Sequence, residues 1–168
     1  TDGDGYVDKD GQKLSINWLT YPTRLEQPKL AEYAQATLKD IGIDVQVNNT
    51  PDHRTFAENG DFDVYVSSVT TAPTGDPEYF FTSTVTGSKN YGNYQNEEVT
   101  KLTDQLHQTF DKDERGKLAI ELQQDILDDD AFFFVSHLNM GIVTKSNVKG
   151  MAAHPCDYYE ITAELDVE

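Results

Sequence analysis

The sequence predicts an α/β fold with a mixed, mainly parallel sheet flanked by helices. Apolar and polar residues alternate in residues 14–18 and again in residues 43–47, as in half-buried strands. Between these segments, apolar residues recur at helical spacing from Leu30 through Tyr33 to Ile41, and Gly42 marks the helix end. A strand, a helix and a strand with short connections form a βαβ unit, whose handedness makes the two strands parallel neighbours.

A third strand is predicted at residues 62–66, where apolar side chains again alternate with polar ones. The preceding residues 51–60 form a polar connection with room for a short helix. After this strand, residues 70–77 read as a loop, and Asp76 is expected to cap a short helix that carries Tyr79.

Two amphipathic helices are predicted next. Asn96 is expected to cap the first, and Asp111 and Glu114 have the spacing of a capping box for the second. The apolar faces of the two helices are expected to consist of Val99, Leu102, Leu106 and Phe110, and of Leu118, Leu122 and Ile126.

The ends of the chain are less regular. Residues 132–135 predict a buried strand and residues 141–144 an edge strand, whereas residues 148–168 show little periodicity. The acidic opening loop has three aspartates, Asp2, Asp4 and Asp8, at partial calcium-loop spacing. The loop lacks the closing glutamate of a calcium loop, so a structural turn is the favoured reading.

Length and charge narrow the classes of function. The 168 residues predict one domain, residues 1–168, and the chain opens without Met, a signal peptide or an apolar anchor, so we expect a fragment of a longer protein. The formal net charge of -17 argues against nucleic acid and anionic lipid as partners. Such a charge favours solubility, or alternatively the gathering of cationic solutes.

Motifs for catalysis are absent from the sequence. It has no phosphate loop, nucleophile elbow, zinc-protease helix or paired cysteines, and its four histidines are scattered. The single cysteine, Cys156, lies near His154 in a polar tail and is read as an incidental thiol. The run Asp128–Asp130 is read as solvated, with weak cation binding as the alternative. The sequence therefore predicts no enzyme and no metal site.

Two polar segments form the candidate ligand site. The first, 70–79, follows the carboxyl end of a strand, where open α/β sheets bind ligands. The second, 88–94, combines amides, phenols and an ammonium group, which suit a small polar solute. The predicted ligand-binding residues are Thr70, Thr71, Tyr79, Lys89, Asn90, Tyr91, Asn93 and Tyr94. The alternative is an ordinary polar loop whose tyrosines pack on a neighbouring helix.

Five stretches, in order, resemble the C-terminal lobe of the family 5 extracellular solute-binding proteins. They are DGDGYVDKDGQKLSINWLTYP at 2–22, LAEYAQATLKDIGIDVQV at 30–47, GDFDVYVSSVTTAPTGDPEYFFTS at 60–83, NYGNYQNEEVTKL at 90–102 and FVSHLNMGIVTKSNVKGMAAHP at 134–155. The APTGDPEYF loop looks most like the nickel and metal-chelate branch of that family. Thr70 and Thr71 stand where relatives often place an aromatic residue, and no histidine lies near Lys89 as in one nickel-binding branch.

The resemblance implies a periplasmic-binding-protein fold of type II, whose two lobes close on a solute and then dock on an ABC permease. It implies the substrate-binding component of an importer for nickel or other metal chelates or short peptides, with residues 148–168 returning toward an N-terminal lobe. No cofactor is expected, apart from a metal chelate carried as solute, which Lys89 or Asn93 would hold by a carboxylate.

The resemblance also implies a monomer outside the cytoplasm, either in the periplasm or as a cell-surface lipoprotein whose anchor lies outside this chain. Two alternatives stay open: a sensory lobe of the same fold, and a lobe of a hydrolase.

Overall fold

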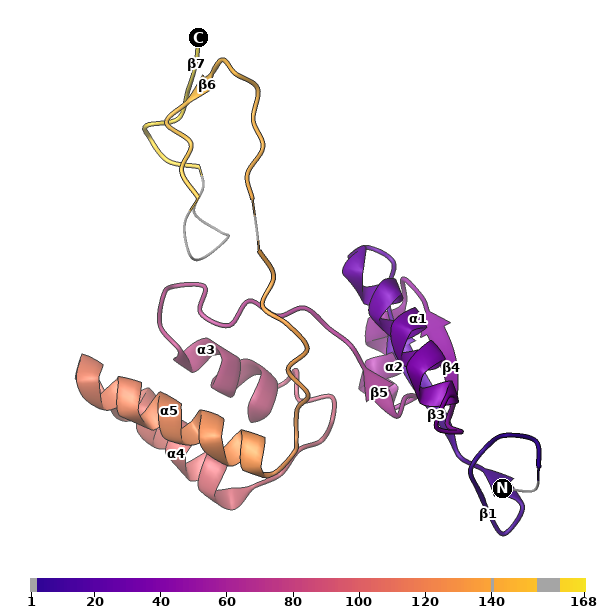
Figure 1. The fold of residues 1–168 in the computed structure, drawn as a ribbon. Coiled ribbons are helices and arrows are strands. Elements are labelled where there is room, and N and C mark those ends of the chain that lie inside the picture. Colours follow the sequence, from indigo (N-terminus) through magenta and orange to yellow (C-terminus); the bar gives the residue numbers. More distant parts are fainter. Residues whose placement is uncertain (1–2, 140, 154–160) are drawn as a thin grey trace. The chain divides into compact units, whose positions relative to one another are not determined.

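A computed structural model describes residues 3–139, 141–153 and 161–168 (Figure 1). The chain divides into two units, Thr1–Ser68 and Val69–Glu168, each with its own internal contacts. The assignment of both units to one lobe of a longer protein stays a prediction.

The first unit opens with a hairpin of β1 (Asp8–Lys9) and β2 (Gln12–Lys13). Its turn residues, Asp10 and Gly11, have φ angles of 53° and 74°, the positive values that a tight hairpin turn with an Asp-Gly pair adopts. The expected structural turn is therefore confirmed. Asp2 lies outside the described residues, and those that are described contain no cluster of three His, Cys, Asp or Glu side chains that could hold a metal ion.

The sheet has three parallel strands, β3 (Ser15–Thr20), β4 (Asp44–Asn49) and β5 (Val64–Tyr65), in the order β4-β3-β5. Ile16 pairs with Val45 in the β3–β4 register, as the βαβ interpretation requires. Although β5 is short, the N–H of Val66 donates to the Leu19 carbonyl, so its pairing with β3 continues beyond the strand's end. The parallel βαβ unit is confirmed.

Helix α1 (Glu26–Lys39) packs along β3 and β4 (Figure 1) and begins four residues before the predicted start. Its buried residues are Gln27 and Ala31. Two members of the predicted stripe are exposed, Tyr33 and Ile41. Tyr33 follows Ala31 by two residues, which is about 200° around the helix and places it on the opposite face, and Ile41 follows the helix end.

Three aromatic rings meet where the strands of this unit end. Tyr21, which follows β3, is buried and stacks on His53 with ring centroids 4.1 Å apart. His53 begins α2 (His53–Asn59), and its Nδ1 lies 2.7 Å from the Tyr65 hydroxyl. The Tyr21 hydroxyl accepts a hydrogen bond from the Ser68 N–H. These contacts tie the ends of β3 and β5 to α2.

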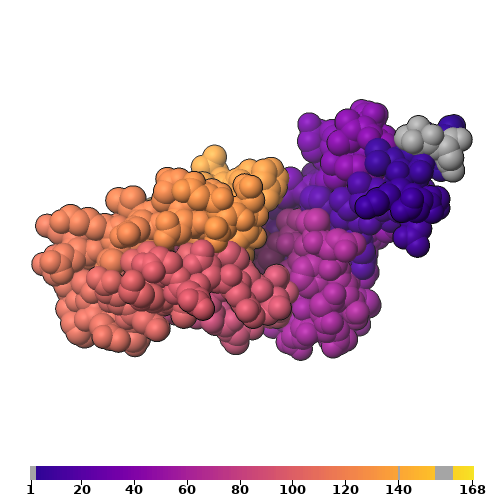
Figure 2. Space-filling model, turned by 90° about the horizontal axis from the view of Figure 1, so that it is seen from below, coloured from indigo at the N-terminus to yellow at the C-terminus, as the bar shows by residue number. Residues whose placement is uncertain are grey.

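The second unit is built around two neighbouring helices, α4 (Glu97–Gln108) and α5 (Lys112–Asp128), preceded by α3 (Glu78–Phe80) and the π-helical turn η1 (Phe81–Val85). The pink and orange residues of α4 and α5 form one continuous body (Figure 2). Their shared core contains Phe81, Val85, Val99, Leu102, Leu106, Leu118, Ala119, Leu122 and Ile126.

The predicted caps of this unit are confirmed. Asn96 accepts hydrogen bonds from the N–H groups of Glu98 and Val99, Asp111 does so from Asp113 and Glu114, and Asp76 accepts from the N–H of Glu78. Phe110 was expected on the buried stripe of α4 but is 92% exposed. Thr109 has extended backbone angles that end the helix and turn the chain away before Phe110.

The strands predicted at 132–135 and 141–144 do not form. Phe133 is 88% exposed, Phe134 and Val135 are also exposed, and in the described parts of 131–147 no strand pairing is present. An apolar run shows that a segment can pair, but pairing also requires a neighbouring strand edge. Of this run, only Phe132 packs partly against the core. Later, β6 (Val148–Lys149) pairs antiparallel with β7 (Asp166–Val167).

Among the described residues, no helix combines the length and the apolar character that crossing a bilayer demands.

We predict that Leu122→Ala destabilises the helical unit by about 3 kcal/mol, because it removes a fully buried side chain and leaves a cavity. Ile120→Ala, on the same helix but 68% exposed, is the matched control and should cost less than about 0.5 kcal/mol. Urea unfolding followed by far-ultraviolet circular dichroism measures both. Equal losses in the two variants would contradict the assigned core.

We predict that the first unit loses stability as the pH falls below the ordinary pKa of histidine. Burial, and to a lesser degree the charge of Arg54, lowers the pKa of His53 in the folded protein. The unfolded chain therefore binds a proton at a higher pH than the folded one, and protonation favours unfolding in the window between the two pKa values. Urea unfolding across this pH range, followed by the fluorescence of Trp18, tests the effect.

His53→Phe keeps a ring against Tyr21 but cannot titrate, so its stability should depend less on pH than that of the wild type. An unchanged pH dependence would assign the effect to other groups.

Candidate functional site

The two predicted segments meet through Tyr79 and Lys89. The Lys89 Nζ donates a hydrogen bond of 3.0 Å to the Tyr79 hydroxyl and lies 5.4 Å from the centroid of its ring. Tyr79 is 38% exposed, in α3, and Lys89 is exposed in the loop that follows η1. The structure therefore places a phenol and an ammonium group side by side on the surface of the second unit.

Asn90 and Tyr94 shape the second segment from within. The Asn90 side chain donates to the Tyr94 carbonyl and accepts from the Tyr94 N–H, at 2.8 and 3.0 Å. The Tyr94 ring packs against the helical core, as the alternative reading of these tyrosines expected. Its hydroxyl donates to Asp129 at 2.6 Å, and Asp129 also accepts from the Asn96 side chain. Both predicted residues thus hold the loop in shape.

The other predicted residues are placed as follows. Asn93 is exposed and has a left-handed φ of 52°, which turns the loop between Asn90 and Tyr94. Thr70 and Tyr91 are half-buried, whereas Thr71 is exposed. Their contact with a solute stays a prediction.

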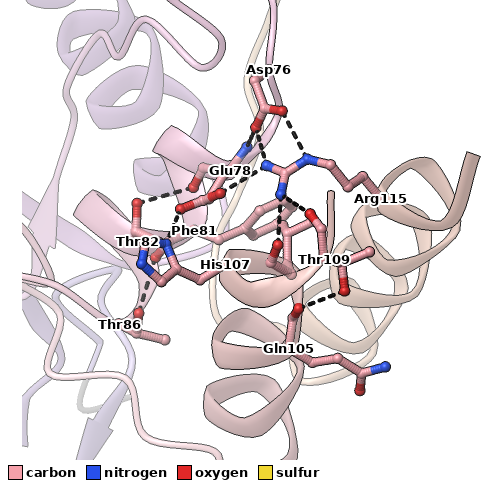
Figure 3. Close-up of polar contacts among 10 residues, drawn as sticks. Asp76, Glu78, Phe81, Thr82, Thr86, Gln105, His107, Thr109 and Arg115 are labelled. Carbon is pink, nitrogen blue, oxygen red and sulfur yellow. Dashed lines mark hydrogen bonds and ion pairs between the residues drawn. The ribbon is translucent and has the colours of Figure 1, made fainter. Parts of the chain in front are cut away.

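Arg115, which the sequence did not single out, joins the first segment to the two long helices (Figure 3). Its Nε and Nη2 donate to the two oxygens of Asp76 at 2.9 and 2.6 Å, and Nη2 also donates to Glu78 at 2.7 Å. Nη1 donates to the carbonyls of Leu106 and Thr109, both at 2.6 Å, at the end of α4. This side chain is only 14% exposed.

The charges of this cluster are paired. The hydrogen bond from Arg115 holds the pKa of Asp76 below its usual range. The pKa of Glu78 is lowered by its contact with His107, whose Nδ1 lies 2.6 Å from it, and by Arg115. The two carboxylates in turn raise the pKa of Arg115. Asp76, Glu78 and Arg115 border an open hollow of about 310 Å³ that Tyr79 also lines.

Sequence reasoning missed Arg115 and Asp129 because both act across long separations. Arg115 lies 39 residues from Asp76, and Asp129 lies 35 residues from Tyr94. An arginine on a helix and an aspartate in an acidic run are ordinary surface residues in a sequence. The predicted solvated run is confirmed, since all three residues of Asp128–Asp130 are exposed, although Asp129 bonds to Tyr94 and Asn96 and Asp128 accepts from the side chain of Gln124.

The arrangement suits binding rather than bond making. A phenol and an ammonium group can both donate hydrogen bonds to carboxylates, and the ring of the phenol can pack against apolar groups of a solute. Within the described ranges no three His, Cys, Asp or Glu side chains cluster as metal ligands. The prediction for His154 and Cys156 falls outside the described residues.

Comparison with known proteins finds a matching family of solute-binding proteins and relatives that are themselves named as binding proteins. The profile of the family described as "Bacterial extracellular solute-binding proteins, family 5 Middle" matches residues 1–92. The oligopeptide-binding protein AppA of Bacillus subtilis is 30% identical over 96% of this chain and 31% of its own length. The nickel-binding protein NikA of Staphylococcus aureus is 27% identical over 98% of this chain and 34% of its own length.

Solved structures of these two proteins resemble the present one. AppA with a bound nonapeptide has a TM-score of 0.77 at 28% identity, covering 93% of this chain and 32% of that one. NikA from S. aureus with Ni(L-His)2 has a TM-score of 0.75 at 25% identity, covering 99% and 36%. The chain thus spans about a third of the length of these relatives. Peptide-binding and nickel-binding relatives match to a similar degree, so they do not separate the two solute classes.

We predict that Asp129→Asn lowers the pKa of Tyr94. Burial and the hydrogen bond to Asp129 together raise that pKa to about 12. Removing the negative charge favours the phenolate, while burial keeps the pKa above its ordinary value. Asp128→Asn removes a charge one residue away and should leave the pKa unchanged. The pKa of Tyr94 can be measured in each variant by NMR, from the chemical shifts of its ring carbons as the pH is raised. Equal pKa values in the two variants would refute the assigned contact.

Proposed function

Because the chain belongs to the bacterial extracellular solute-binding proteins of family 5, we propose that it is part of the substrate-binding component of an ABC importer. Its solute is a nickel or other metal chelate, or a short peptide. It contributes contacts and no chemical step, so it is not an enzyme. Within this proposal, the second unit offers one side of the binding site.

The observation that carries the proposal is the pairing of Lys89 with Tyr79. The two side chains come from the two segments predicted to bind ligand, and they meet at the surface, 3.0 Å apart. A solute carboxylate can accept a hydrogen bond from the Lys89 ammonium group, and the exposed ring of Tyr79 offers an adjacent apolar face. Asn93, exposed in the same loop, can add an amide contact.

Both solute classes carry groups that this pair recognises. A peptide ends in a carboxylate, and so does each histidine of the nickel complex bound by the S. aureus relative. The net charge of -17 attracts solutes that are cationic overall, while Lys89 supplies a local positive charge for a carboxylate. A solute with a cationic part and a carboxylate would be attracted both by the net negative charge of the chain and by the local positive charge of Lys89.

The metal is expected to arrive already chelated. In the part of the chain that the structure describes, no group of three metal-ligating side chains is present. A chelate brings its own ligands and presents only its outer carboxylates and apolar parts to the protein. The full-length protein should therefore bind free Ni²⁺ more weakly than Ni²⁺ with L-histidine, and equal affinity would exclude this form of the solute.

The chain by itself is expected to bind weakly. It spans about a third of its relatives' length, and the proposed site is completed by a second lobe. A solute that contacts one side only forgoes the contacts that would offset the entropy lost on binding. The complete protein is proposed to act as a monomer outside the cytoplasm, in the periplasm or as a surface lipoprotein, and to dock on an ABC permease.

Two alternative functions, a sensory lobe and a lobe of a hydrolase, predict different experimental results from those of an importer component. A sensory lobe would bind the same solute, but loss of the protein would leave uptake of labelled solute unchanged. A hydrolase lobe would release a cleaved product from a peptide. The similarity to a solved structure described as a nickel ABC transporter from Bacillus halodurans favours transport over both.

Native mass spectrometry of the full-length protein purified from its host tests the proposal directly. A co-purified peptide or a metal with organic ligands is the expected finding. Loss of that mass on mild unfolding identifies it as a bound solute. A protein that carries no solute and binds neither peptides nor Ni²⁺ with L-histidine in calorimetry would overturn the proposal.

We predict that Lys89→Met in the full-length protein weakens solute binding by about 2 kcal/mol, or roughly thirty-fold in Kd, because a charge-assisted hydrogen bond is lost. The control is Lys117→Met, an exposed lysine on α5, which removes the same charge from the protein. Isothermal titration with the co-purified solute gives both values. An equal weakening in the two variants would show that only net charge matters.

A further inference from the structure

We propose that Arg115 is the positioning residue of this binding site: by holding Asp76 and Glu78, it fixes Tyr79 where Lys89 can reach it. This inference rests on the proposed solute-binding function. Arg115 itself is expected to make no contact with the solute. It lies on α5, and its effect passes through the two carboxylates that precede Tyr79 in the chain.

The guanidinium group has no freedom left in this arrangement. Each of its three nitrogens donates to at least one oxygen: Nε to Asp76, Nη2 to Asp76 and Glu78, and Nη1 to Leu106 and Thr109. A planar group bonded on every side has one orientation, unlike the rotating ammonium of lysine. Figure 3 shows the guanidinium between Asp76 and the end of α4. Arg115 therefore links α3, α4 and α5 at one point.

Tyr79 needs an external anchor because its own helix is too short to hold it. Helix α3 (Glu78–Phe80) runs directly into η1 (Phe81–Val85), and even this joined segment is shorter than the roughly 12 residues that an isolated helix needs for marginal stability. Asp76 accepts from the N–H of Glu78 as well as from Arg115, so this bond fixes the backbone directly before Tyr79. On the other side, Phe81 is buried in the helical core. Tyr79 lies between these two anchors.

The negative charges of Asp76 and Glu78 also make the guanidinium group of Arg115 necessary for the position of Tyr79. Asp76 and Glu78 each place an oxygen within 2.7 Å of the same Nη2 atom, so two carboxylates lie close together. Without the guanidinium they would repel each other, and His107 contacts only Glu78. Separating the carboxylates moves the start of α3, and Tyr79 with it, away from Lys89. The hydrogen bond of 3.0 Å between them is the contact that reports such a movement.

Two variants that retain most of the cluster test this role. Arg115→Lys keeps the charge but not the planar fork, and Asp76→Asn keeps Arg115 but weakens its bidentate partner. The control is Lys112→Met, which removes an exposed charge from the first residue of the same helix. NMR of the chain follows the nuclear Overhauser effect between the Tyr79 ring and the Lys89 side chain, with the contacts of Phe81 as a reference for the core.

We expect the Tyr79–Lys89 signal to persist in the wild type and in Lys112→Met. It should be lost in Arg115→Lys and Asp76→Asn while the Phe81 contacts remain. A purely structural role would make both sets of signals disappear together, and that result would overturn the inference. Retention of the Tyr79–Lys89 signal in both variants would overturn it as well.

Binding by the full-length protein separates this inference from the proposed function. With Ni²⁺ and L-histidine as the probe, or a nonapeptide mixture, Arg115→Lys should weaken binding by about ten-fold, and Lys112→Met by less than about two-fold. If the wild type binds neither probe while the NMR result holds, the proposed function fails and the positioning of Tyr79 stands. If the wild type binds and Arg115→Lys binds equally well, the positioning role fails alone.

Discussion

The helical unit depends on one largely buried cation, the guanidinium of Arg115, whose side chain is 14% exposed. Helices α4 and α5 share an apolar core, but burial is non-directional and does not by itself determine where the chain before them lies. Arg115 supplies the direction, since it bonds to Asp76 ahead of α3, to Glu78 at the first residue of α3, and to two carbonyls at the end of α4. The last carbonyls of a helix have few backbone partners, and the Leu106 carbonyl accepts from the capping N–H of Thr109, so the bonds from Arg115 add to the capping of α4.

A second charged anchor lies at the other end of α5. Asp129, directly after the helix, accepts hydrogen bonds from Tyr94 and Asn96 and so holds the loop that carries Lys89. Arg115 and Asp129 are fourteen positions apart, which corresponds to about 21 Å along a helix. One rigid element thus holds both segments of the proposed binding site. Helices serve this purpose better than loops, because their backbone hydrogen bonds are internal.

In the first unit, aromatic rings rather than charged groups hold the strand ends in place. Its parallel strands end where Tyr21, His53 and Tyr65 contact one another, and Ser68 joins them through its backbone N–H. Burial, and to a lesser degree the charge of Arg54, lowers the pKa of His53 and so favours the neutral imidazole here. In the second unit the anchors are instead ionised, and their contacts hold the pKa values of Asp76 and Glu78 low. The two units therefore respond to acid through different groups.

The sequence by itself determined the features that depend on residues close to one another in the chain, which are the strands, the helices and their caps. Alternation and helical spacing predicted the βαβ unit and α4 and α5, and the caps at Asn96 and Asp111 follow from side chains bonding to N–H groups two or three residues away. The two polar segments were also expected to form one site, from the position of the first after a strand and the amide, phenol and ammonium groups of the second, and Tyr79 and Lys89 do meet.

Only the tertiary structure decided the contacts that join distant parts of the chain. Arg115 and Asp129 look like surface charges until folding brings Asp76 and Tyr94 to them. The apolar run at 132–135 predicted a strand, but Phe133 is exposed and no strand among the described residues pairs with this run. Local patterns are set by bonds between near neighbours, whereas these outcomes depend on which partner the fold supplies.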